Sequence, residues 1–190
     1  VDLLMGLLEP TAGCLLVDGS NLHNLDHPHL LAAWQATIAH VPQSIYLADS
    51  TIAENIAFGI PSDQIDMARV KQAADQAQIS SFIEDSPDQY QSFVGERGIR
   101  LSGGQRQRLG ISRALYKRAR VLVFDEATSA LDSDTEEAVM TAIDGLSDDL
   151  TIIMIAHRLS TIEGCDRVIH LSQGGLVADG PPNQVLPYII

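Results

Sequence analysis

The sequence predicts an α/β fold with a largely parallel sheet and an inserted helical subdomain. Near-continuous apolar strands that alternate with helices are typical of a sheet buried between helices. From residue 100 onward the chain shows this alternation, with apolar runs at Val121–Phe124 and Thr151–Ala156. A mostly helical stretch, residues 47–99, interrupts it. We therefore expect a core formed by residues 1–46 and 100–190, with residues 47–99 as the inserted subdomain.

The first eight residues are expected to be helical. Leucines recur at helical spacing at positions Leu3, Leu4, Leu7 and Leu8, which is the pattern of an amphipathic helix. Neither a starting Met nor a capping Ser, Thr, Asn or Asp precedes residue 1. We therefore expect that the N-terminal part of the core is missing from this sequence. The alternative is a frayed native start whose Met has been removed.

Residues 9–46 are expected to alternate between strands and a short helix. The expected elements are a strand over Cys14–Val17, a tight turn at Asp18–Gly19, a helix over Leu30–Gln35 and a strand over Thr37–Val41. An Asp-Gly pair between apolar segments is a strong hairpin signal. The strand over Thr37–Val41 is followed by Pro42 and Gln43.

The predicted subdomain contains three helices. Thr51 and Glu54 have the spacing of a capping box, which predicts a helix start, and Gly59 is expected to close that helix. The second helix is expected over Asp63–Gln78, and a third, short one contains Phe82. The residues expected on the buried face of the second helix are Val70, Ala73, Ala74 and Ala77.

The second half of the chain is expected to continue the alternation. The expected elements are helices over Gly103–Arg118 and Ser133–Asp144, the two apolar strands, and final strands over Arg167–Leu171 and Leu176–Asp179. The final strands flank a turn at Gly174–Gly175. The whole chain has 45% hydrophobic residues, as ordinary globular proteins do.

The segment Leu101–Gln105 is the first candidate for chemistry. Ser102 and Gln105 have capping-box spacing at a helix start, and Gly103 and Gly104 leave the backbone N–H groups of the first turn bare. A bare helix N-terminus favours anions, and phosphate above all. The alternative is an ordinary helix cap with two tolerated glycines.

Polar residues at the ends of predicted strands are the second candidate. Asp125 and Glu126 follow one apolar strand, Gln43 follows another, and His157 a third. Ligands bind at the carboxyl edge of open α/β sheets, and carboxylates with water suit Mg²⁺ bound to phosphates. Taken singly, each could be a solvated turn residue; gathered at one edge, they predict a site.

These motifs resemble, in order, those of the nucleotide-binding domain of an ATP-binding-cassette (ABC) transporter of the exporter type. Leu101–Gln105 matches the signature sequence of that family, and Val121–Glu126 matches its Walker B strand. Ser129–Asp132 matches the D-loop, Gln43 the Q-loop and His157 the switch histidine. The resemblance covers nearly the whole chain and implies a P-loop NTPase-type core.

The phosphate-binding loop of that family, G-x-x-x-x-G-K-[ST], is absent. Neither lysine of the chain, Lys71 or Lys117, follows a glycine. In the family a helix like the one expected at residues 1–8 follows this Walker A loop, so we expect the sequence to begin just after it. The chain by itself is then expected to be inactive as an ATPase.

The resemblance implies that the intact protein binds MgATP between two such domains arranged head to tail. The residues implied to contact the γ-phosphate are Ser102, Gly103, Gly104, Gln105 and His157. It further implies Glu126 as the general base, Asp125 and Gln43 as the groups that serve Mg²⁺, and Asp132 as a residue that crosses the dimer interface.

The implied partners are a second nucleotide-binding domain and the transmembrane domains of a transporter, at the cytoplasmic face of a membrane. Val94–Gly98 resembles the exporter X-loop, which touches those domains. The alternative is a soluble ABC-type ATPase that acts on nucleic acid or ribosomes. The net charge of −13 disfavours it, because nucleic-acid binding needs basic contacts to phosphates.

Four basic residues of the predicted helix over Gly103–Arg118 and its exit are expected on one face: Arg106, Arg113, Lys117 and Arg120. They could contact a nucleotide or a partner. We instead expect a solvated face that balances the acidic chain.

Overall fold

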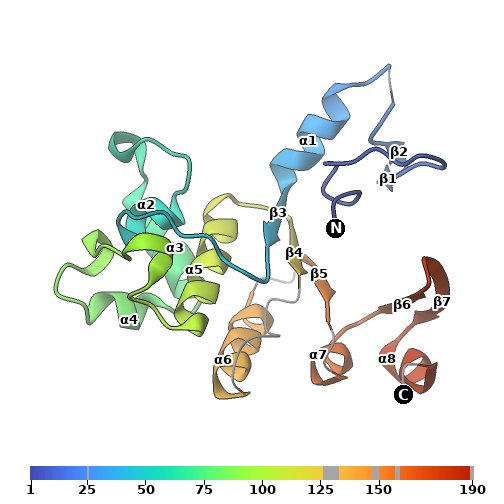
Figure 1. Ribbon diagram of the computed structural model, residues 1–190. Helices are drawn as coiled ribbons and strands as arrows, with labels where there is room; N and C mark the ends of the chain where they lie inside the picture. Colours follow the sequence, from blue (N-terminus) through green and yellow to red (C-terminus); the bar gives the residue numbers. More distant parts are fainter. Residues whose placement is uncertain (25, 126–132, 147–149, 157–158, 189–190) are drawn as a thin grey trace. The chain divides into compact units, whose positions relative to one another are not determined.

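The computed structural model describes residues 1–24, 26–125, 133–146, 150–156 and 159–188 (Figure 1). The chain forms two compact units, Val1–Ile155 and Ala156–Ile190. Three of the predicted site residues, Glu126, Asp132 and His157, lie outside the described residues.

The first unit contains a three-stranded parallel sheet. Its strands are β3 (Ile38–Val41), β4 (Val121–Asp125) and β5 (Thr151–Ile155), in the order β3-β4-β5 (Figure 1). Both pairings are parallel, with Val41 opposite Phe124 and Phe124 opposite Met154. The central strand is buried from Leu122 to Phe124, as its unbroken apolar run predicts. The predicted α/β class with a parallel sheet is confirmed.

A small hairpin and a helix precede this sheet. The hairpin pairs β1 (Leu16–Val17) with β2 (Ser20–Asn21), and α1 (His29–Thr37) leads directly into β3. Asp18 and Gly19 have φ angles of 48° and 76°, the left-handed values that a two-residue hairpin turn requires. The predicted turn is therefore confirmed.

The prediction of a helix over residues 1–8 is wrong. These residues form turns, and Gly6 has a left-handed φ of 67°. The local backbone bonds are irregular: the N–H of Met5 donates to Val1 O as in a helix, but the N–H of Leu7 donates to Asp2 O, both at 2.9 Å. Side chains of α1 bind two carbonyls of this segment, since Trp34 Nε1 donates to Leu4 O at 2.7 Å and Gln35 Nε2 donates to Gly6 O at 3.1 Å.

The chain between β3 and β4 is largely helical. Its elements are α2 (Ile52–Ile56), η1 (Ser62–Gln64), α3 (Met67–Gln76), α4 (Ser80–Glu84), η2 (Gln89–Gln91), η3 (Glu96–Gly98) and α5 (Gly103–Tyr116). The predicted apolar face of α3 is buried at Val70, Ala73 and Ala74. Helix α3 begins later than predicted because the Asp66 side chain caps it by accepting from the N–H of Arg69 at 3.1 Å.

The helices α2 and α3 pack against α5, and α5 contacts β3. The resulting core is continuous, since buried residues of α2 and α3 cluster with Val41 and Phe124 of the sheet. The predicted boundaries of the subdomain, residues 47–99, stay a prediction. Helix α6 (Ser133–Asp144) has the predicted bounds and packs against α5, with Val139 and Ile143 buried.

The second unit is built on an antiparallel hairpin. Strands β6 (Val168–Ser172) and β7 (Gly175–Gly180) pair across the predicted turn. The unit also contains three short helices: α7 (Leu159–Glu163), α8 (Pro182–Val185) and η4 (Leu186–Tyr188). Arg167 binds Asp179 through two hydrogen bonds of 2.7 and 2.6 Å, and this pairing lowers the pKa of Asp179.

The capping box predicted at Thr51 and Glu54 is present. Thr51 Oγ1 accepts from the N–H of Glu54 at 3.2 Å, and Glu54 Oε2 accepts from the N–H of Thr51 at 3.0 Å. Ser62 Oγ also donates to Glu54 Oε1 at 2.7 Å. These hydrogen bonds hold the pKa of Glu54 below its usual value of 4.5, and the bond from the Thr51 backbone has the largest effect.

We expect the Glu54→Gln variant to lose part of the acid sensitivity of folding. A carboxylate whose folded pKa is depressed stabilises the fold above its unfolded pKa, and this contribution disappears as the pH falls through the folded pKa. Urea unfolding between about pH 6 and about pH 3 measures it. The wild type should lose more stability than Glu54→Gln over this range, whereas the exposed-site control Asp63→Asn should behave like the wild type. Equal slopes for Glu54→Gln and the wild type would contradict the assignment.

Candidate nucleotide-binding site

The carboxyl edge of the parallel sheet brings the predicted strand ends together. Asp125 is the last residue of β4 and lies opposite Ile155, the last residue of β5. Gln43 is exposed and follows β3 by two residues. Because the three strands are parallel and in register, their ends meet at one edge, where α/β proteins bind ligands. In the sequence, Glu126 directly follows β4 and His157 follows β5 by two residues.

A histidine that the sequence analysis missed lies beside Asp125. His40 Nε2 is 3.8 Å from Asp125 Oδ2, and both side chains are about one-third exposed, at 31% and 36%. His40 is the exposed residue of β3, between the buried Ala39 and Val41. A polar residue inside an otherwise apolar strand was the available signal in the sequence, although its proximity to Asp125 depends on the pairing of β3 with β4.

The donor set at this edge fits Mg²⁺. Asp125 offers a partly exposed carboxylate and Gln43 an amide oxygen, which are hard oxygen ligands. In the described part of the chain no three His, Cys, Asp or Glu residues cluster to form a closed metal site. Mg²⁺ is commonly held by one or two carboxylates, with water and substrate phosphates completing its shell.

The second group of predicted residues begins helix α5. Ser102 is its N-cap: Ser102 Oγ accepts from the N–H of Gln105 at 3.2 Å, and Gln105 Oε1 accepts from the N–H of Ser102 at 2.8 Å. The predicted capping box is confirmed. Ser102 and Gly103 are exposed and Gly104 is buried. The Ser102 hydroxyl keeps its own hydrogen to donate, and the helix dipole favours an anion at this turn.

The basic residues of α5 and its exit segment do not all form the expected solvated face. Arg113 is partly buried: its Nε donates to Asn55 O and its Nη1 to Tyr46 O, both at 3.0 Å. The guanidinium also lies 4.5 Å from the ring centre of Phe58. Burial lowers the pKa of Arg113. Its function in the fold is to satisfy backbone carbonyls of the segment that follows Gln43.

Two further basic residues bind backbone carbonyls in the same way. Lys117 Nζ donates to Gln35 O and to Ile38 O, both at 2.7 Å. Arg106 Nη1 donates to Leu101 O at 2.8 Å. The prediction of a solvated face is therefore wrong for Arg106 and Arg113, which are only partly exposed. Lys117 and Arg120 are exposed as predicted, although Lys117 also binds two carbonyls.

Asn55, which the sequence analysis did not single out, holds the segment after Gln43 in place. Its Oδ1 accepts from the N–H of Ala48 at 2.9 Å, and its Nδ2 donates to the carbonyls of Ala48 and Thr51, both at 3.0 Å. Asn55 is almost fully buried, at 1% exposure. In the sequence, the one signal for this role was a polar residue among the apolar residues expected on the buried face of α2.

The fold and the site agree with a family match. The model of the family described as "ABC transporter" matches residues 1–129, which is more than half of the chain. The chain belongs to the ABC transporter family.

Relatives within this family are similar over almost the whole chain. The "ATP-dependent lipid A-core flippase" of Ralstonia nicotianae is 43% identical over 187 residues, which are 98% of this chain and 31% of that protein. The "Multidrug resistance ABC transporter ATP-binding and permease protein" of Lactococcus lactis is 39% identical over 97% of this chain and 30% of its own length. The chain thus spans about a third of these relatives.

A solved structure shows the same architecture. The bacterial Atm1-family ABC exporter with ATP bound is 38% identical and superposes with a TM-score of 0.85, over 99% of this chain and 32% of that one. Within the part of the ABC chain that the structure describes, no helix is long and apolar enough to cross a membrane.

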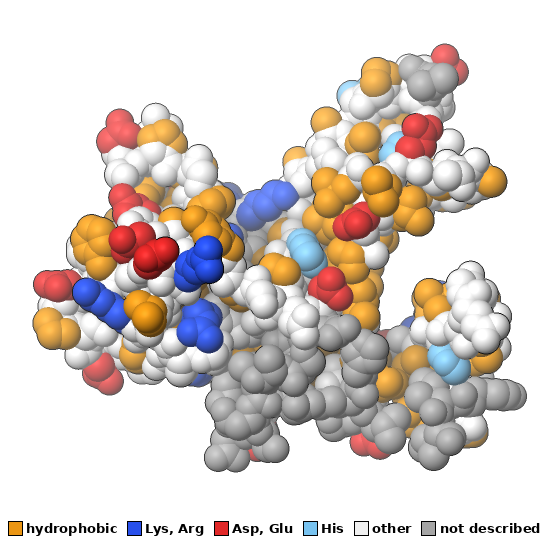
Figure 2. All heavy atoms as spheres, in the orientation of Figure 1, with side chains coloured by type: hydrophobic (Ala, Val, Ile, Leu, Met, Phe, Trp, Pro, Cys, Tyr) orange, Lys and Arg blue, Asp and Glu red, His pale blue; other side chains and the backbone are white. Residues whose placement is uncertain are grey.

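The segment that resembles the X-loop has an unusual backbone in this ABC chain. Gly95, Arg97 and Gly98 all have left-handed φ angles, of 75°, 53° and 70°. Phe93 and Ile99 flank this segment in the sequence and have exposed apolar side chains. Earlier in the chain, the exposed large apolar side chains are those of Tyr46, Phe58 and Ile60. Figure 2 shows hydrophobic side chains interspersed with charged ones over the helices α2 to α4. Such exposed apolar groups are typical of an interaction surface.

Proposed function

We propose that this chain is part of the ATP-hydrolysing motor domain of an ABC exporter, positioned at the cytoplasmic face of a membrane, and that without the phosphate-binding loop it is inactive by itself. The observation that supports this most is the in-register parallel sheet, which gathers the ends of β3, β4 and β5 at one edge. That edge holds Asp125 and Gln43 in a chain of the ABC transporter family. ATP would bind between two such domains arranged head to tail.

Across the head-to-tail pair, each nucleotide would meet the sheet edge of one domain and the start of α5 of the other. The start of α5 would contact the γ-phosphate held by a partner domain, with the N–H groups of Gly103 and Gly104 and the hydroxyl of Ser102 as donors. Gln105 orients that hydroxyl through the capping box. Phosphoryl transfer depends on positioning and on stabilising charge, and donors fixed in a helix cap need little reorganisation to do both.

The sheet edge would supply the metal and the base. Mg²⁺ would be held by Asp125 and Gln43, and when bound it would neutralise charge on the phosphate oxygens. Glu126 would accept a proton from the attacking water, and His157 would donate to the γ-phosphate. Asp132 would cross the interface to the partner domain. His40, 3.8 Å from Asp125, would help to orient that carboxylate.

The coupling to transport would run through the segment after Gln43. Asn55 and Arg113 bind its carbonyls at Tyr46 and Ala48 and so join it to α2 and α5. A displacement of Gln43 on ATP binding would therefore reach the helices. The loop Val94–Gly98 and the exposed apolar residues beside it would meet the transmembrane domains. The names of two similar proteins mention different substances, lipid A-core in one and multidrug resistance in the other. The proposal therefore concerns the exporter class and names no transported substance.

We expect Asp125→Asn to weaken Mg²⁺ use by the complete transporter. An interaction with a charged group contributes about 1.5–3 kcal/mol to binding. Half-maximal ATP hydrolysis by Asp125→Asn should therefore need roughly 10- to 100-fold more Mg²⁺ than in the wild type. ATP hydrolysis measured against Mg²⁺ concentration tests this. The matched control is Asp144→Asn, an exposed carboxylate of α6. An unchanged Mg²⁺ dependence in Asp125→Asn would remove Asp125 from the metal site.

A further inference from the structure

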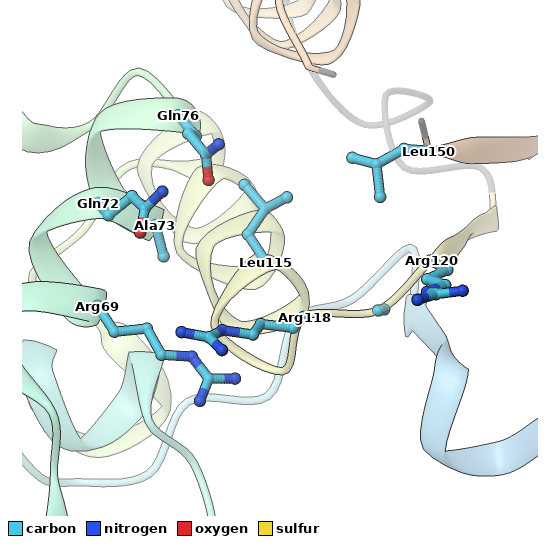
Figure 3. Close-up of a pocket in the computed structure, with 9 residues that line it drawn as sticks. Arg69, Gln72, Ala73, Gln76, Leu115, Arg118, Arg120 and Leu150 are labelled. Carbon is cyan, nitrogen blue, oxygen red and sulfur yellow. The ribbon is translucent and has the colours of Figure 1, made fainter. Parts of the chain in front are cut away.

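A cavity of about 600 Å³ lies at the opposite end of the sheet strands from the candidate nucleotide site. It is lined by α3, by the last turn of α5 and by the segments that lead into β4 and β5 (Figure 3). Arg120 immediately precedes β4 and Leu150 immediately precedes β5, which places this cavity at the amino edge of the sheet. Helix α5, with 14 residues and so about 20 Å long, separates it from the turn at Ser102.

The lining is strongly basic. Arg69, Arg118 and Arg120 contribute to it, together with the amides of Gln72 and Gln76, and no Asp or Glu among the described residues does. Figure 3 shows the side chains of Arg69 and Arg118 pointing toward one another. Like charges that converge without a counter-ion repel each other. In a chain with a net charge of −13, three arginines in one cavity, with no acidic side chain in its described lining, indicate an anionic ligand.

The three arginines of the cavity have no acidic partner among the described residues, where none of them forms an ion pair. Arg69 stacks on Tyr116, with its guanidinium carbon 4.4 Å from the ring centre. Its Nε is buried and has no hydrogen-bond partner among the described residues. A buried donor left unpaired is costly, and a ligand in the cavity could satisfy it.

The backbone holds the other two arginines in the lining. Arg118 follows the C-cap of α5 and has a left-handed φ of 57°, a position where glycine is usual. Arg120 is fixed to the sheet, because its N–H donates to Thr37 O at 2.7 Å and its carbonyl accepts from the N–H of Thr151 at 2.9 Å. An arginine at a position that favours glycine suggests that its side chain is needed.

We propose that this cavity binds a small molecule that bears a phosphate group and a short apolar part. The planar guanidinium groups match phosphate oxygens, with which they form paired charge-assisted hydrogen bonds. A phosphate monoester has close to two negative charges at neutral pH, which suits several arginines. Leu115, Leu150 and Ala73 supply an apolar wall, and the volume lies in the usual range of ligand pockets.

Calorimetric titration of the purified protein with phenyl phosphate tests the proposal. We expect phenyl phosphate to bind, and inorganic phosphate to bind more weakly because it lacks a group for the apolar wall. Arg118→Gly should weaken the binding of phenyl phosphate by at least about tenfold. The Arg118→Gly protein should also unfold at the same temperature as the wild type or at a higher one, because glycine suits the left-handed backbone at this position. This combination separates a lost ligand contact from a lost fold.

A control variant defines the site. Lys71→Gln removes one exposed positive charge from α3 outside the cavity and should bind phenyl phosphate as the wild type does. The proposal is overturned by equal binding in Arg118→Gly or by an equal loss in Lys71→Gln. Binding of vesicles that contain phosphatidic acid, without binding of phenyl phosphate, would also overturn it.

Discussion

Replacement of Glu126 by glutamine in the complete transporter is expected to stop ATP hydrolysis almost entirely while ATP still binds. An amide has nearly the shape of a carboxylate but accepts no proton from water. General-base catalysis accelerates a reaction by about 10²- to 10⁴-fold, so the rate of ATP hydrolysis should decrease by a factor in that range. In the proposed site, binding rests on other residues, among them Ser102 and Asp125, which the substitution leaves in place.

Phosphate release and equilibrium ATP binding, measured on the same preparations, test this expectation. Glu137→Gln is the matched control, since it removes an exposed carboxylate of α6 that has no proposed role. A control that hydrolyses ATP normally beside an inactive, ATP-binding Glu126→Gln supports the general-base role. A Glu126→Gln protein with the wild-type rate would rule that role out, and one that no longer binds ATP would give the residue a binding role instead.

Local sequence patterns were enough to predict the features that depend on local physics. The apolar run over Val121–Phe124 gave a buried central strand because a strand covered on both faces has no polar side. The capping boxes at Thr51 and Ser102 formed as their spacing predicts, since each closes within one helical turn. The parallel arrangement then followed from the alternation of strands and helices.

Features that depend on distant contacts were not predictable in this way. The leucines at residues 1–8 have helical spacing, but the segment forms turns, and Trp34 and Gln35, about 30 positions away, bind two of its carbonyls. Lys117 is exposed as predicted, but its bonds to the carbonyls of Gln35 and Ile38 could not be predicted from its helix alone. His40 becomes a neighbour of Asp125 only through the pairing of β3 with β4.

Asn55→Ala is expected to destabilise the protein more than any other single polar substitution proposed above. The buried amide of Asn55 forms four hydrogen bonds, with Ala48, Ser50 and Thr51, and its Oδ1 also accepts from Arg113 Nη2 at 3.4 Å. Alanine would leave the N–H of Ala48 without its partner, whereas the carbonyl of Ala48 would keep its bond from the N–H of Ser50. An unsatisfied buried group costs about 1–3 kcal/mol, so a loss of about 1–3 kcal/mol in unfolding free energy follows.

Urea unfolding of the purified protein measures this loss as a lower midpoint. Ser50→Ala is the matched control, because it removes the hydroxyl that accepts from Asn55 Nδ2 at 3.1 Å and that also bonds the carboxylate of Glu54; it should cost about 1 kcal/mol or less. Asn55→Asp separates the two halves of the amide: it keeps the acceptor for the N–H of Ala48 but cannot donate to its carbonyl. If Asn55→Ala unfolded at the wild-type midpoint, the segment after Gln43 would be held by Arg113 and apolar packing instead, and the coupling route through Asn55 would be lost.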